Sequence, residues 1–414
     1  MTHDVAVVGL GRVGLPLALA FADRGLSVVG VDVDRTRLAA VRSGRMPLEE
    51  TDGQAVLDRV APTGRLELSD RVGDAARARR IVITLGTPTF SHIEIDIRDV
   101  RSALDDLLPV LRDGHLLVLR STIAPGTTEF VAGYLAKHRP DVDVLVAHAP
   151  ERIAAGRFFT EIETLPQIVG GVDERSTEAA AELFATFGAE LRRTTPVQAE
   201  LAKIWTNILR YTQFALPNLL MVDCDQYGAN VFEVIDLINR DYPRGGMAAP
   251  GLTAGTCLRK DFAFSEERSN GPGMLLAVSR VHESIPNFLV SGMKRRLGGS
   301  LRDRRVAVLG LAFKAGTDDE RDSLAHKLVR LLERELADVA VHDPHVATPT
   351  QGFEEAVRGA DAVVVATNHE AFARRLGDVV GLADDDAVLV DPWNCLGAGD
   401  VFAYAAEVAA PVRA

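Results

Sequence analysis

Short apolar runs alternate with helical patterns along the first part of the chain. The run 5–8, Val-Ala-Val-Val, ends at Gly9, and a β-branched run that ends in glycine predicts a buried strand. A helical pattern follows over residues 14–24, with Gly25 placed to cap its end, and a second strand is expected over 27–31. Further strands are expected at 81–84, 116–119 and 142–146. Strands that alternate with helices predict a doubly wound parallel sheet.

The pattern becomes helical from about residue 196. Residues 200–239 carry long helical patterns, which we expect to break near Pro217 and Gly228. A loop rich in glycine and proline follows at 242–255, and another helix is expected over 273–297. A helical region of this kind could form a central spine and a dimer surface.

A second α/β pattern occupies the remainder of the chain. Its strands are expected at 305–310, 339–343, 362–367 and 387–391. We therefore expect an α/β protein with two Rossmann-like, doubly wound parallel-sheet domains joined by a helical central domain. The expected boundaries are 1–195 for the N-terminal domain, 196–300 for the central domain and 301–414 for the C-terminal domain.

Composition and charge narrow the classes of partner. The 414 residues carry a net charge of −12, which argues against a general affinity for nucleic acid. No apolar run reaches the length of a membrane span, and no signal segment precedes the first strand, so we expect a cytoplasmic protein without a membrane partner. The three cysteines at 224, 257 and 395 are too few for a disulfide framework, and no His/Cys cluster has the spacing of a metal site.

A dinucleotide-binding turn is predicted at the end of the first strand. Gly9, Gly11 and Gly14 form a GxGxxG segment directly between that strand and the first helix. The first glycine permits the turn, the second lets a pyrophosphate approach the backbone, and the third allows the helix to pack closely. The helix N-terminus supplies unpaired N–H groups for the phosphates.

The residue that reads the adenosine ribose is expected at the end of the second strand. Asp32 lies about twenty residues beyond the turn, where a carboxylate accepts from the ribose 2′-hydroxyl. Because this carboxylate would repel a 2′-phosphate, NAD is favoured over NADP. Arg35 and Arg37 lie close enough to leave NADP open at this point.

Several further segments combine glycine, proline and reactive side chains in a set order. They are Gly-Thr-Pro-Thr at 86–89, Ser-Thr-Ile-Ala-Pro-Gly-Thr at 121–127, Pro150-Glu151 with Gly156, Ala-Glu-Leu-Ala-Lys at 199–203 with Asn207, Gly-Thr-Cys-Leu-Arg-Lys-Asp at 255–261, Gly-Leu-Ala-Phe-Lys at 310–314, Asp-Asp-Glu-Arg-Asp-Ser at 318–323 and Asp-Pro-Trp-Asn at 391–394. Together these segments resemble the UDP-glucose/GDP-mannose dehydrogenase family over nearly the whole chain.

The resemblance implies an NAD-dependent nucleotide-sugar 6-dehydrogenase, which oxidises the sugar C6 hydroxymethyl group to a carboxylate with two NAD per sugar. Cys257 would hold the intermediate as a thiohemiacetal and then as a thioester. Lys203 and Asn207, at i and i+4 of one helix, would stabilise the oxyanion. Asp261 would act with an ordered water as base, and Glu151 would activate the hydrolytic water. Thr122 would position that water and the nicotinamide.

The resemblance also implies two sets of binding residues. The cofactor set is Gly9, Gly11, Arg12, Val13, Gly14, Asp32, Arg37, Thr87, Pro88, Thr89, Ser121, Thr122 and Arg321. The substrate set is Glu151, Arg152, Lys203, Asn207, Arg244, Gly251, Phe313 and Lys314. The implied partners are a nucleotide sugar, with a UDP-sugar favoured, and further copies of the chain in a homodimer or higher homo-oligomer.

The chain departs from the family pattern close to Glu151. The family commonly has a second glutamate four residues later, where this chain has Ala155. The segment Glu-Arg-Ile-Ala at 151–154 also differs from the aromatic-led form of many UDP-glucose enzymes, and it resembles more closely the form of enzymes of N-acetylated or otherwise modified sugars. UDP-glucose and a UDP-N-acetylhexosamine both stay open as substrates.

Two other functions compete with this interpretation. A β-hydroxyacid or 6-phosphogluconate-type dehydrogenase makes a single hydride transfer and needs neither a cysteine nor a second α/β domain. The Cys257 loop and the α/β pattern after Arg305 argue against that class. A catalytically silent NAD-binding protein would have no reason to keep Glu151, Lys203 and Asp261 together with the cysteine.

Overall fold

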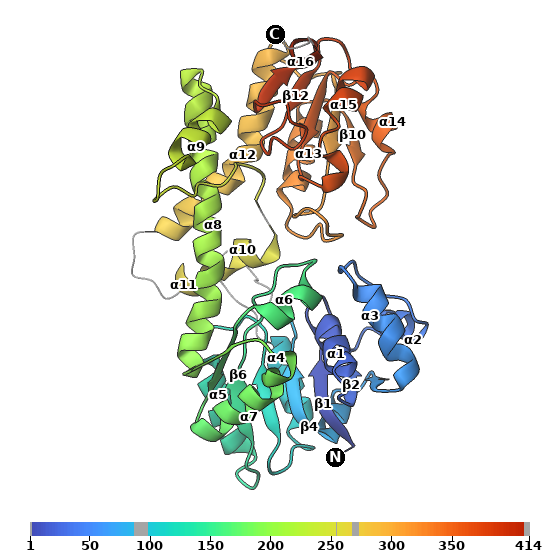
Figure 1. Ribbon diagram of the computed structural model, residues 1–414, viewed down its shortest axis with the longest axis vertical. Helices are drawn as coiled ribbons and strands as arrows, with labels where there is room; N and C mark the ends of the chain where they lie inside the picture. Colours follow the sequence, from blue (N-terminus) through green and yellow to red (C-terminus); the bar gives the residue numbers. More distant parts are fainter. Residues whose placement is uncertain (1, 87–97, 254, 267–272, 410–414) are drawn as a thin grey trace. The chain divides into compact units, whose positions relative to one another are not determined.

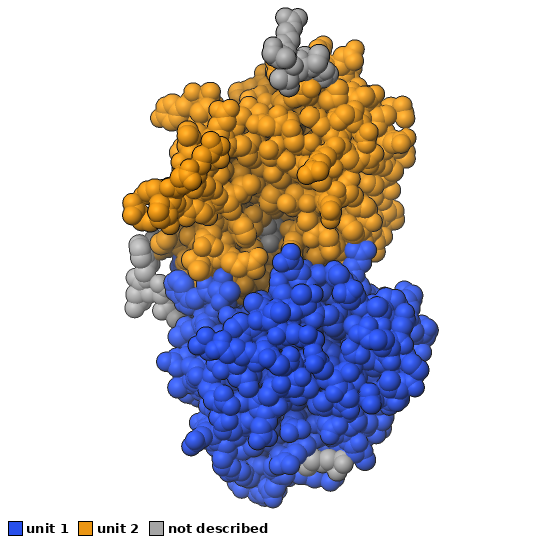
Figure 2. Space-filling view, viewed as in Figure 1, with its two compact units in different colours: residues 1–206, 263–269 blue, residues 207–262, 270–414 orange. Residues whose placement is uncertain are grey.

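The computed structural model describes residues 2–86, 98–253, 255–266 and 273–409 (Figure 1). It forms two compact units, which Figure 2 distinguishes by colour. Unit 1 comprises Met1–Thr206 and Ala263–Ser269, and unit 2 comprises Asn207–Phe262 and Asn270–Ala414. The boundaries expected for three domains stay a prediction.

Unit 1 is built on an eight-stranded sheet whose order is β3-β2-β1-β4-β5-β6-β7-β8. The strands are β1 His3–Val8, β2 Val28–Val31, β3 Leu66–Ser69, β4 Ala78–Ile83, β5 Leu116–Leu119, β6 Leu145–His148, β7 Gln167–Gly171 and β8 Leu191–Thr194. The first six follow the order 3-2-1-4-5-6 of the dinucleotide-binding fold. All neighbours are parallel except β6 and β7.

Helices cover both faces of this sheet. The helices of unit 1 are α1 Gly14–Asp23, α2 Arg35–Arg42, α3 Gly53–Val60, α4 Arg98–Leu107, α5 Thr127–His138, α6 Phe158–Thr164, α7 Glu174–Phe184 and α11 Ala263–Glu266, with the start of α8 Pro196–Tyr227. Val5 and Val7 of β1 belong to one apolar core, and Ala6 and Val8 belong to another. A strand buried on both faces reads as a continuous apolar run, which is why β1 could be predicted.

Unit 2 contains a five-stranded sheet of order β10-β9-β11-β12-β13. The strands are β9 Arg305–Leu309, β10 Asp338–His342, β11 Ala362–Val365, β12 Val388–Val390 and β13 Phe402–Tyr404. Only β13 is antiparallel to its neighbour. The order 2-1-3-4-5 places the topological switch point, where such sheets bind ligands, at the carboxyl ends of β9 and β11. The helices are the rest of α8, α9 Val231–Asn239, α10 Thr256–Asp261, α12 Met274–Arg296, α13 Leu324–Arg334, α14 Phe353–Val357, α15 Leu376–Leu382 and α16 Ala405–Ala409.

The helix break expected near Pro217 was wrong. Helix α8 continues through Pro217 and ends at Tyr227, next to the break expected at Gly228. Proline removes one backbone hydrogen bond, and packing elsewhere on the helix can offset that loss. Asn218 is fully buried and bonds both backbone groups of Gly251, so tertiary contacts hold the helix at this turn.

The fold class is confirmed as α/β, with two mostly parallel sheets and a helical central region. Four strands were missed, namely β3, β7, β8 and β13. Three of them, β3, β8 and β13, are edge strands, which carry a weaker apolar pattern because one edge faces no neighbour. The strand expected at 142–146 forms at Leu145–His148. Among the described residues, no helix is long and apolar enough to cross a membrane.

Candidate active site

The GxGxxG turn of unit 1 has the geometry of a phosphate-binding loop. Gly9 adopts a φ of 94°, and a Cβ on Gly14 would lie 1.8 Å from the Gly9 carbonyl oxygen, so only glycine fits there. A Cβ on Gly11 would meet nothing within 4 Å, which leaves room for a pyrophosphate to approach. The N-cap residue Val13 makes no side-chain hydrogen bond to the start of α1. Its N–H groups can therefore bind an anion.

A cavity of about 350 Å³ lies beside this turn and fits the adenosine of a dinucleotide. Asp32, Asp99 and Asp106 line it together with Arg37. Asp32 accepts from the Leu10 N–H at 2.6 Å and from Arg37 Nη1 at 2.7 Å. Because its guanidinium is paired with a carboxylate, Arg37 offers little free positive charge to a 2′-phosphate, and the cavity favours NAD over NADP. Thr87, Pro88 and Thr89 lie outside the described residues.

The loop after β5 is tied to the start of α8 by Glu200. This buried carboxylate accepts from the backbone N–H groups of Gly126 at 2.6 Å and Thr128 at 2.8 Å, and from the Thr128 hydroxyl at 2.6 Å. Burial raises the pKa of Glu200 against the effect of these hydrogen bonds. The Ser121 hydroxyl donates to the Leu85 carbonyl at 2.5 Å, so both predicted cofactor residues, 121 and 122, stand on a braced loop. Sequence reasoning did not assign Glu200.

Glu151 follows β6 and is buried beside Arg120, the last residue before Ser121. Arg120 Nη2 lies 2.6 Å from Glu151 Oε2, and the side chain of Arg120 is 0% exposed. His148 is also buried, and loss of hydration lowers its pKa to about 3, so its ring is neutral. Arg152 donates to the Pro166 carbonyl, and burial lowers the pKa of its guanidinium. Neither Arg120 nor His148 was predicted.

Lys203 is a cation of α8 whose surroundings suit a ligand. It is half-buried on α8 and, within the described part of the chain, makes no hydrogen bond or ion pair. Its charge is one of the causes that lower the pKa of His148, after burial and the charge of Arg120. A half-buried ammonium without a protein partner is suited to an anionic group of a ligand.

Unit 2 carries Cys257 in the first turn of α10, exposed to solvent. Gly255 precedes the helix with a φ of 96°, and a Cβ there would lie 2.4 Å from the ring of Phe313. Glycine thus lets the loop that carries Phe313 lie against the cysteine loop. The positive end of a helix favours the thiolate form of a cysteine.

A cation also lies within electrostatic reach of Cys257. The pKa of Arg321 is raised chiefly by hydrogen bonds to Asp319, at 2.8 and 2.7 Å, and in smaller part by the negative charge of Cys257. Arg259 of α10 donates to the Asp322 carbonyl at 3.1 Å and pairs with Glu283 at 2.6 Å. These contacts, which sequence reasoning missed, fix α10 against the loop of Arg321.

Asn207 and Asp261 are brought together inside unit 2. Asn207 Nδ2 donates to Asp261 Oδ2 at 2.5 Å, and Asp261 is fully buried. Lys260 Nζ lies 3.1 Å from Oδ1, within ion-pair distance, yet among the described residues Oδ1 has no hydrogen-bond donor in a suitable direction. This oxygen can therefore accept from a water or a hydroxyl group, which fits a carboxylate that works through an ordered water.

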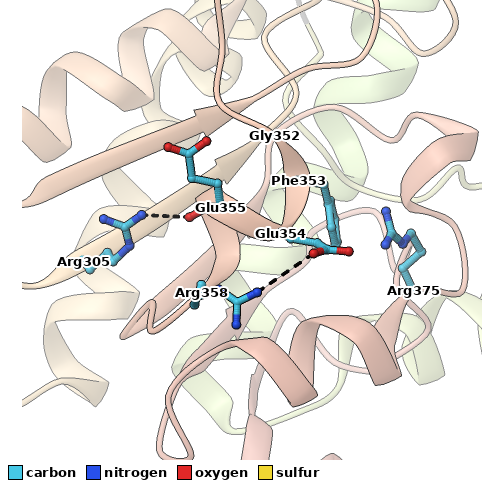
Figure 3. Close-up of a pocket in the computed structure, with 7 residues that line it drawn as sticks. All are labelled: Arg305, Gly352, Phe353, Glu354, Glu355, Arg358 and Arg375. Atoms are coloured by element: carbon cyan, nitrogen blue, oxygen red, sulfur yellow. Dashed lines mark hydrogen bonds and ion pairs between the residues drawn. The ribbon is translucent and has the colours of Figure 1, made fainter.

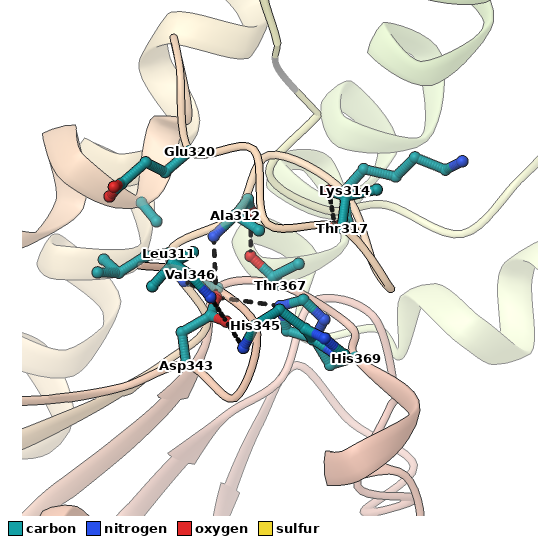
Figure 4. Close-up of polar contacts among 12 residues, drawn as sticks. Leu311, Ala312, Lys314, Thr317, Glu320, Asp343, His345, Val346, Thr367 and His369 are labelled. Carbon is teal, nitrogen blue, oxygen red and sulfur yellow. Dashed lines mark hydrogen bonds and ion pairs between the residues drawn. The ribbon is translucent and has the colours of Figure 1, made fainter. Parts of the chain in front are cut away.

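The loop that follows β9 is braced at the switch point of the second sheet (Figure 4). Asp343 Oδ2 accepts from the N–H groups of Leu311 at 2.6 Å and Ala312 at 2.9 Å, and it lies 3.1 Å from His369 Nε2. Burial acts to raise the pKa of Asp343, but the hydrogen bonds from His369 and the backbone outweigh it and lower that pKa. In Figure 4 the side chain of Lys314 extends away from this cluster.

Two other predicted substrate residues have different surroundings. Arg244 is exposed, and its guanidinium lies 4.8 Å from the centre of the Tyr242 ring. Gly251 is buried, and a Cβ there would lie 2.5 Å from the ring of Trp393. Packing therefore requires a glycine at 251 whether or not it contacts a substrate.

A shallow depression of about 770 Å³ lies beside the amino-terminal end of β9 in the second sheet (Figure 3). Its arginines are paired with protein groups, as Arg305 is with Asp338 at 3.0 Å and Arg375 with Asp378 at 2.7 Å. Arg305 begins β9, whereas ligands of such sheets bind at the carboxyl ends of the strands. The depression is therefore not a candidate nucleotide site.

Comparison with known proteins agrees with the geometry. Residues 3–188 match the NAD binding domain of the UDP-glucose/GDP-mannose dehydrogenase family, residues 197–283 match its central domain and residues 307–398 match its UDP binding domain. A UDP-N-acetyl-D-mannosamine dehydrogenase of Pyrococcus horikoshii is 34% identical over 95% of this chain and 96% of its own.

Solved structures show the same similarity. The UDP-D-ManNAc dehydrogenase of Pyrococcus horikoshii has a TM-score of 0.87 at 33% identity, covering 94% of both chains. A UDP-glucose dehydrogenase of Pyrobaculum islandicum has a TM-score of 0.84 at 29% identity, covering 95% of this chain and 94% of its own. The expected family, cofactor and class of enzyme are confirmed. The chain belongs to the UDP-glucose/GDP-mannose dehydrogenase family and is an NAD-dependent UDP-sugar dehydrogenase.

Proposed function

We propose that this enzyme oxidises UDP-N-acetylmannosamine to the corresponding uronic acid. Two observations support this sugar over UDP-glucose. The UDP-N-acetyl-D-mannosamine dehydrogenase of Pyrococcus horikoshii is the more similar of the two relatives, at 34% identity. The segment Glu-Arg-Ile-Ala at 151–154 also departs from the form of UDP-glucose enzymes.

The first oxidation would use Asp261, Lys203 and Asn207 in the roles that the family resemblance implies. NAD, when bound, supplies the acceptor for one hydride in each of the two oxidation steps. The open oxygen of Asp261 would accept the proton of the C6 hydroxyl through an ordered water. Lys203 and the amide of Asn207 would stabilise the negative charge that develops on the sugar oxygen.

Cys257 would retain the aldehyde. Its thiolate adds to the aldehyde carbon and forms a C–S bond, and the second oxidation leaves a thioester. A water then attacks the carbonyl carbon, the C–S bond breaks, and the thiolate is released with the carboxylate product. Glu151 would accept the proton that the water loses. Each sugar therefore consumes two NAD and one water.

The remaining predicted residues would bind the ligands. We assign the nucleotide to Phe313 and Lys314, since they follow β9 at the switch point of the sheet. The family resemblance implies that the substrate also contacts Arg152, Arg244 and Gly251, and we retain this assignment. Arg321 keeps its role toward the cofactor.

The observation that carries the covalent mechanism is the contrast between Cys257 and the other two cysteines. Cys257 is exposed at a helix N-terminus, whereas burial raises the pKa of both Cys224 and Cys395, the latter to about 11. Only the first therefore has both access and a setting that favours the thiolate.

The test is the yield of NADH from a limiting amount of sugar. UDP-N-acetylmannosamine should give two NADH per sugar and an acid product identified by mass. UDP-glucose, UDP-N-acetylglucosamine and GDP-mannose serve as competing substrates and should react more slowly. One NADH per sugar would overturn the four-electron mechanism, and a clear preference for UDP-glucose would overturn the proposed sugar.

A further inference from the structure

Arg120 donates two hydrogen bonds to one oxygen of Glu151. Its Nε and Nη2 donate to Glu151 Oε2 at 3.1 and 2.6 Å, which occupies both lone pairs of that oxygen. Its Nη1 donates to the Ala149 carbonyl at 3.0 Å, and Gln167 Oε1 lies 3.3 Å from Nη2. The guanidinium also lies 4.7 Å from the ring centre of Phe184. The arginine is thus held on several sides and cannot swing away from the carboxylate.

The other oxygen of Glu151 is only partly engaged. Oε1 accepts the Ile153 N–H at 2.7 Å, so among the described residues one lone pair stays open. A buried carboxylate needs a charged partner or strong hydrogen-bond donors, and Arg120 supplies both. The two arginine bonds to Oε2 also fix the plane in which the open lone pair of Oε1 lies.

The other groups around Glu151 do not replace this charge. Arg152, on the same loop, interacts with Glu151 electrostatically, but its guanidinium donates to Pro166. His148 of β6 is buried and neutral, and Gln167 of β7 is uncharged. The charge of Lys203 on α8 helps to lower the pKa of His148.

We propose that Arg120 is a positioning residue for thioester hydrolysis: it supplies the charge that pairs with Glu151 and presents Oε1 to the attacking water. This inference rests on the proposed role of Glu151. Arg120 touches no reacting atom and acts only through the carboxylate.

The test combines single and double variants with a pH series. In Arg120→Met the buried Glu151 loses its charged partner, and burial of an unpaired carboxylate favours its neutral form. At pH 7 turnover should fall about 100-fold, the lower end of the range for a lost general base, and the acyl-enzyme should accumulate as a mass adduct on Cys257. The deficit relative to wild type should shrink as the pH rises towards 9. Arg120→Lys should restore part of the rate.

The double variant separates positioning from general damage. If Arg120 acts through Glu151, Arg120→Met should cost nothing further in a Glu151→Gln enzyme. Gln167→Leu removes a neighbour of the guanidinium, leaves the pair with Glu151 intact and should keep the wild-type pH profile. An equal loss in both backgrounds, or a deficit independent of pH, would overturn the inference.

The same set distinguishes failure of the proposed function. Glu151→Gln with wild-type thioester hydrolysis would refute the role of Glu151 itself. A different pair of results would refute only the inference about Arg120. In that case Glu151→Gln accumulates acyl-enzyme, but the loss of turnover in Arg120→Met does not change with pH. If Arg120→Met does not fold, Arg120→Lys provides the test. Its turnover should begin to decline at a higher pH than that of wild type when the solution is acidified. An unchanged pH profile would contradict the inference.

Discussion

Exposure and pKa separate the three cysteines at the scale of single residues. Cys224 is buried, and Cys395 is half-buried with its thiol 3.6 Å from the His369 carbonyl. Burial raises the pKa of Cys395 to about 11, so at pH 8 only about one molecule in a thousand carries the thiolate. Cys257, by contrast, is exposed to solvent.

We therefore expect iodoacetamide at pH 8 to label Cys257 first and to abolish turnover. Peptide mass mapping during the reaction gives the order of labelling. A Cys395→Ser enzyme should lose activity at the same rate as wild type, because its reactive thiol is unchanged. Faster labelling of Cys224 or Cys395 would contradict the assignment of Cys257 as nucleophile.

Ala155 offers a second prediction at this scale. The family pattern has a glutamate there, near the cofactor, and Ala155→Glu would restore a hydrogen-bond acceptor. Because one such bond contributes about 0.5–1.5 kcal/mol, the apparent KM for NAD should fall about twofold to tenfold. Initial rates at saturating sugar measure it, with Ala155→Gln as the uncharged match. An unchanged or higher KM would count against a cofactor contact at this position.

A buried histidine of helix α12 packs against helix α8. His282 of α12 stacks on Tyr211 of α8, with ring centres 4.2 Å apart, and its Nε2 lies 2.8 Å from the Tyr211 carbonyl. Asn218, which holds Gly251, lies 3.4 Å from His282 Nδ1. Loss of hydration lowers the pKa of His282 from 6.5 to about 4. The helical core of unit 2 thus needs this ring to be neutral.

The stability of the protein should fall as the pH falls through this range. Between pH 6.5 and about 4 the unfolded chain binds a proton at residue 282 and the folded chain does not, so the free energy of unfolding decreases on acidification. The loss amounts to about 3 kcal/mol for this group and is absent above pH 6.5. Urea unfolding at several pH values gives the free energy of unfolding at each pH. This free energy should fall less steeply on acidification in His282→Gln than in wild type. His138→Gln, at an exposed position, is the control, and an equal slope in both variants would contradict the prediction.

Assembly belongs to the scale of the whole molecule. Within unit 2, α8 exposes Leu209, Leu216 and Leu219, which are 57%, 51% and 47% accessible. Exposed leucines that cluster on one long helix are typical of a subunit interface. We propose that this part of α8 pairs with a second copy of the chain.

The protein should accordingly run as a dimer in light scattering after size exclusion. Leu216→Glu should shift it towards the mass of one chain, because a charge in an apolar interface is costly. Phe130→Glu, on an equally exposed residue of α5, should leave the dimer intact. A wild-type monomer, or a Leu216→Glu dimer of unchanged stability, would contradict the proposal.

Local chemistry is what the sequence by itself determined. The turn at Gly9 and Gly14 and the loop at Gly255 need glycine because of their own backbone angles and nearest contacts, and such demands are visible in a short segment. Buried parallel strands such as β1 and β5 could also be predicted from a short segment. Burial on both faces makes each of their residues apolar. The order of these segments was then enough to indicate the family and the cofactor.

Contacts between distant segments were decided only by the tertiary structure. Arg120 meets Glu151 because β5 and β6 are neighbours, and Glu200 caps the loop at Gly126 from another helix. The carboxylate of Asp261 meets Asn207 across 54 residues. A buried charge needs a partner, but nothing in the local pattern says which distant residue supplies it, because that choice follows from how the strands and helices pack.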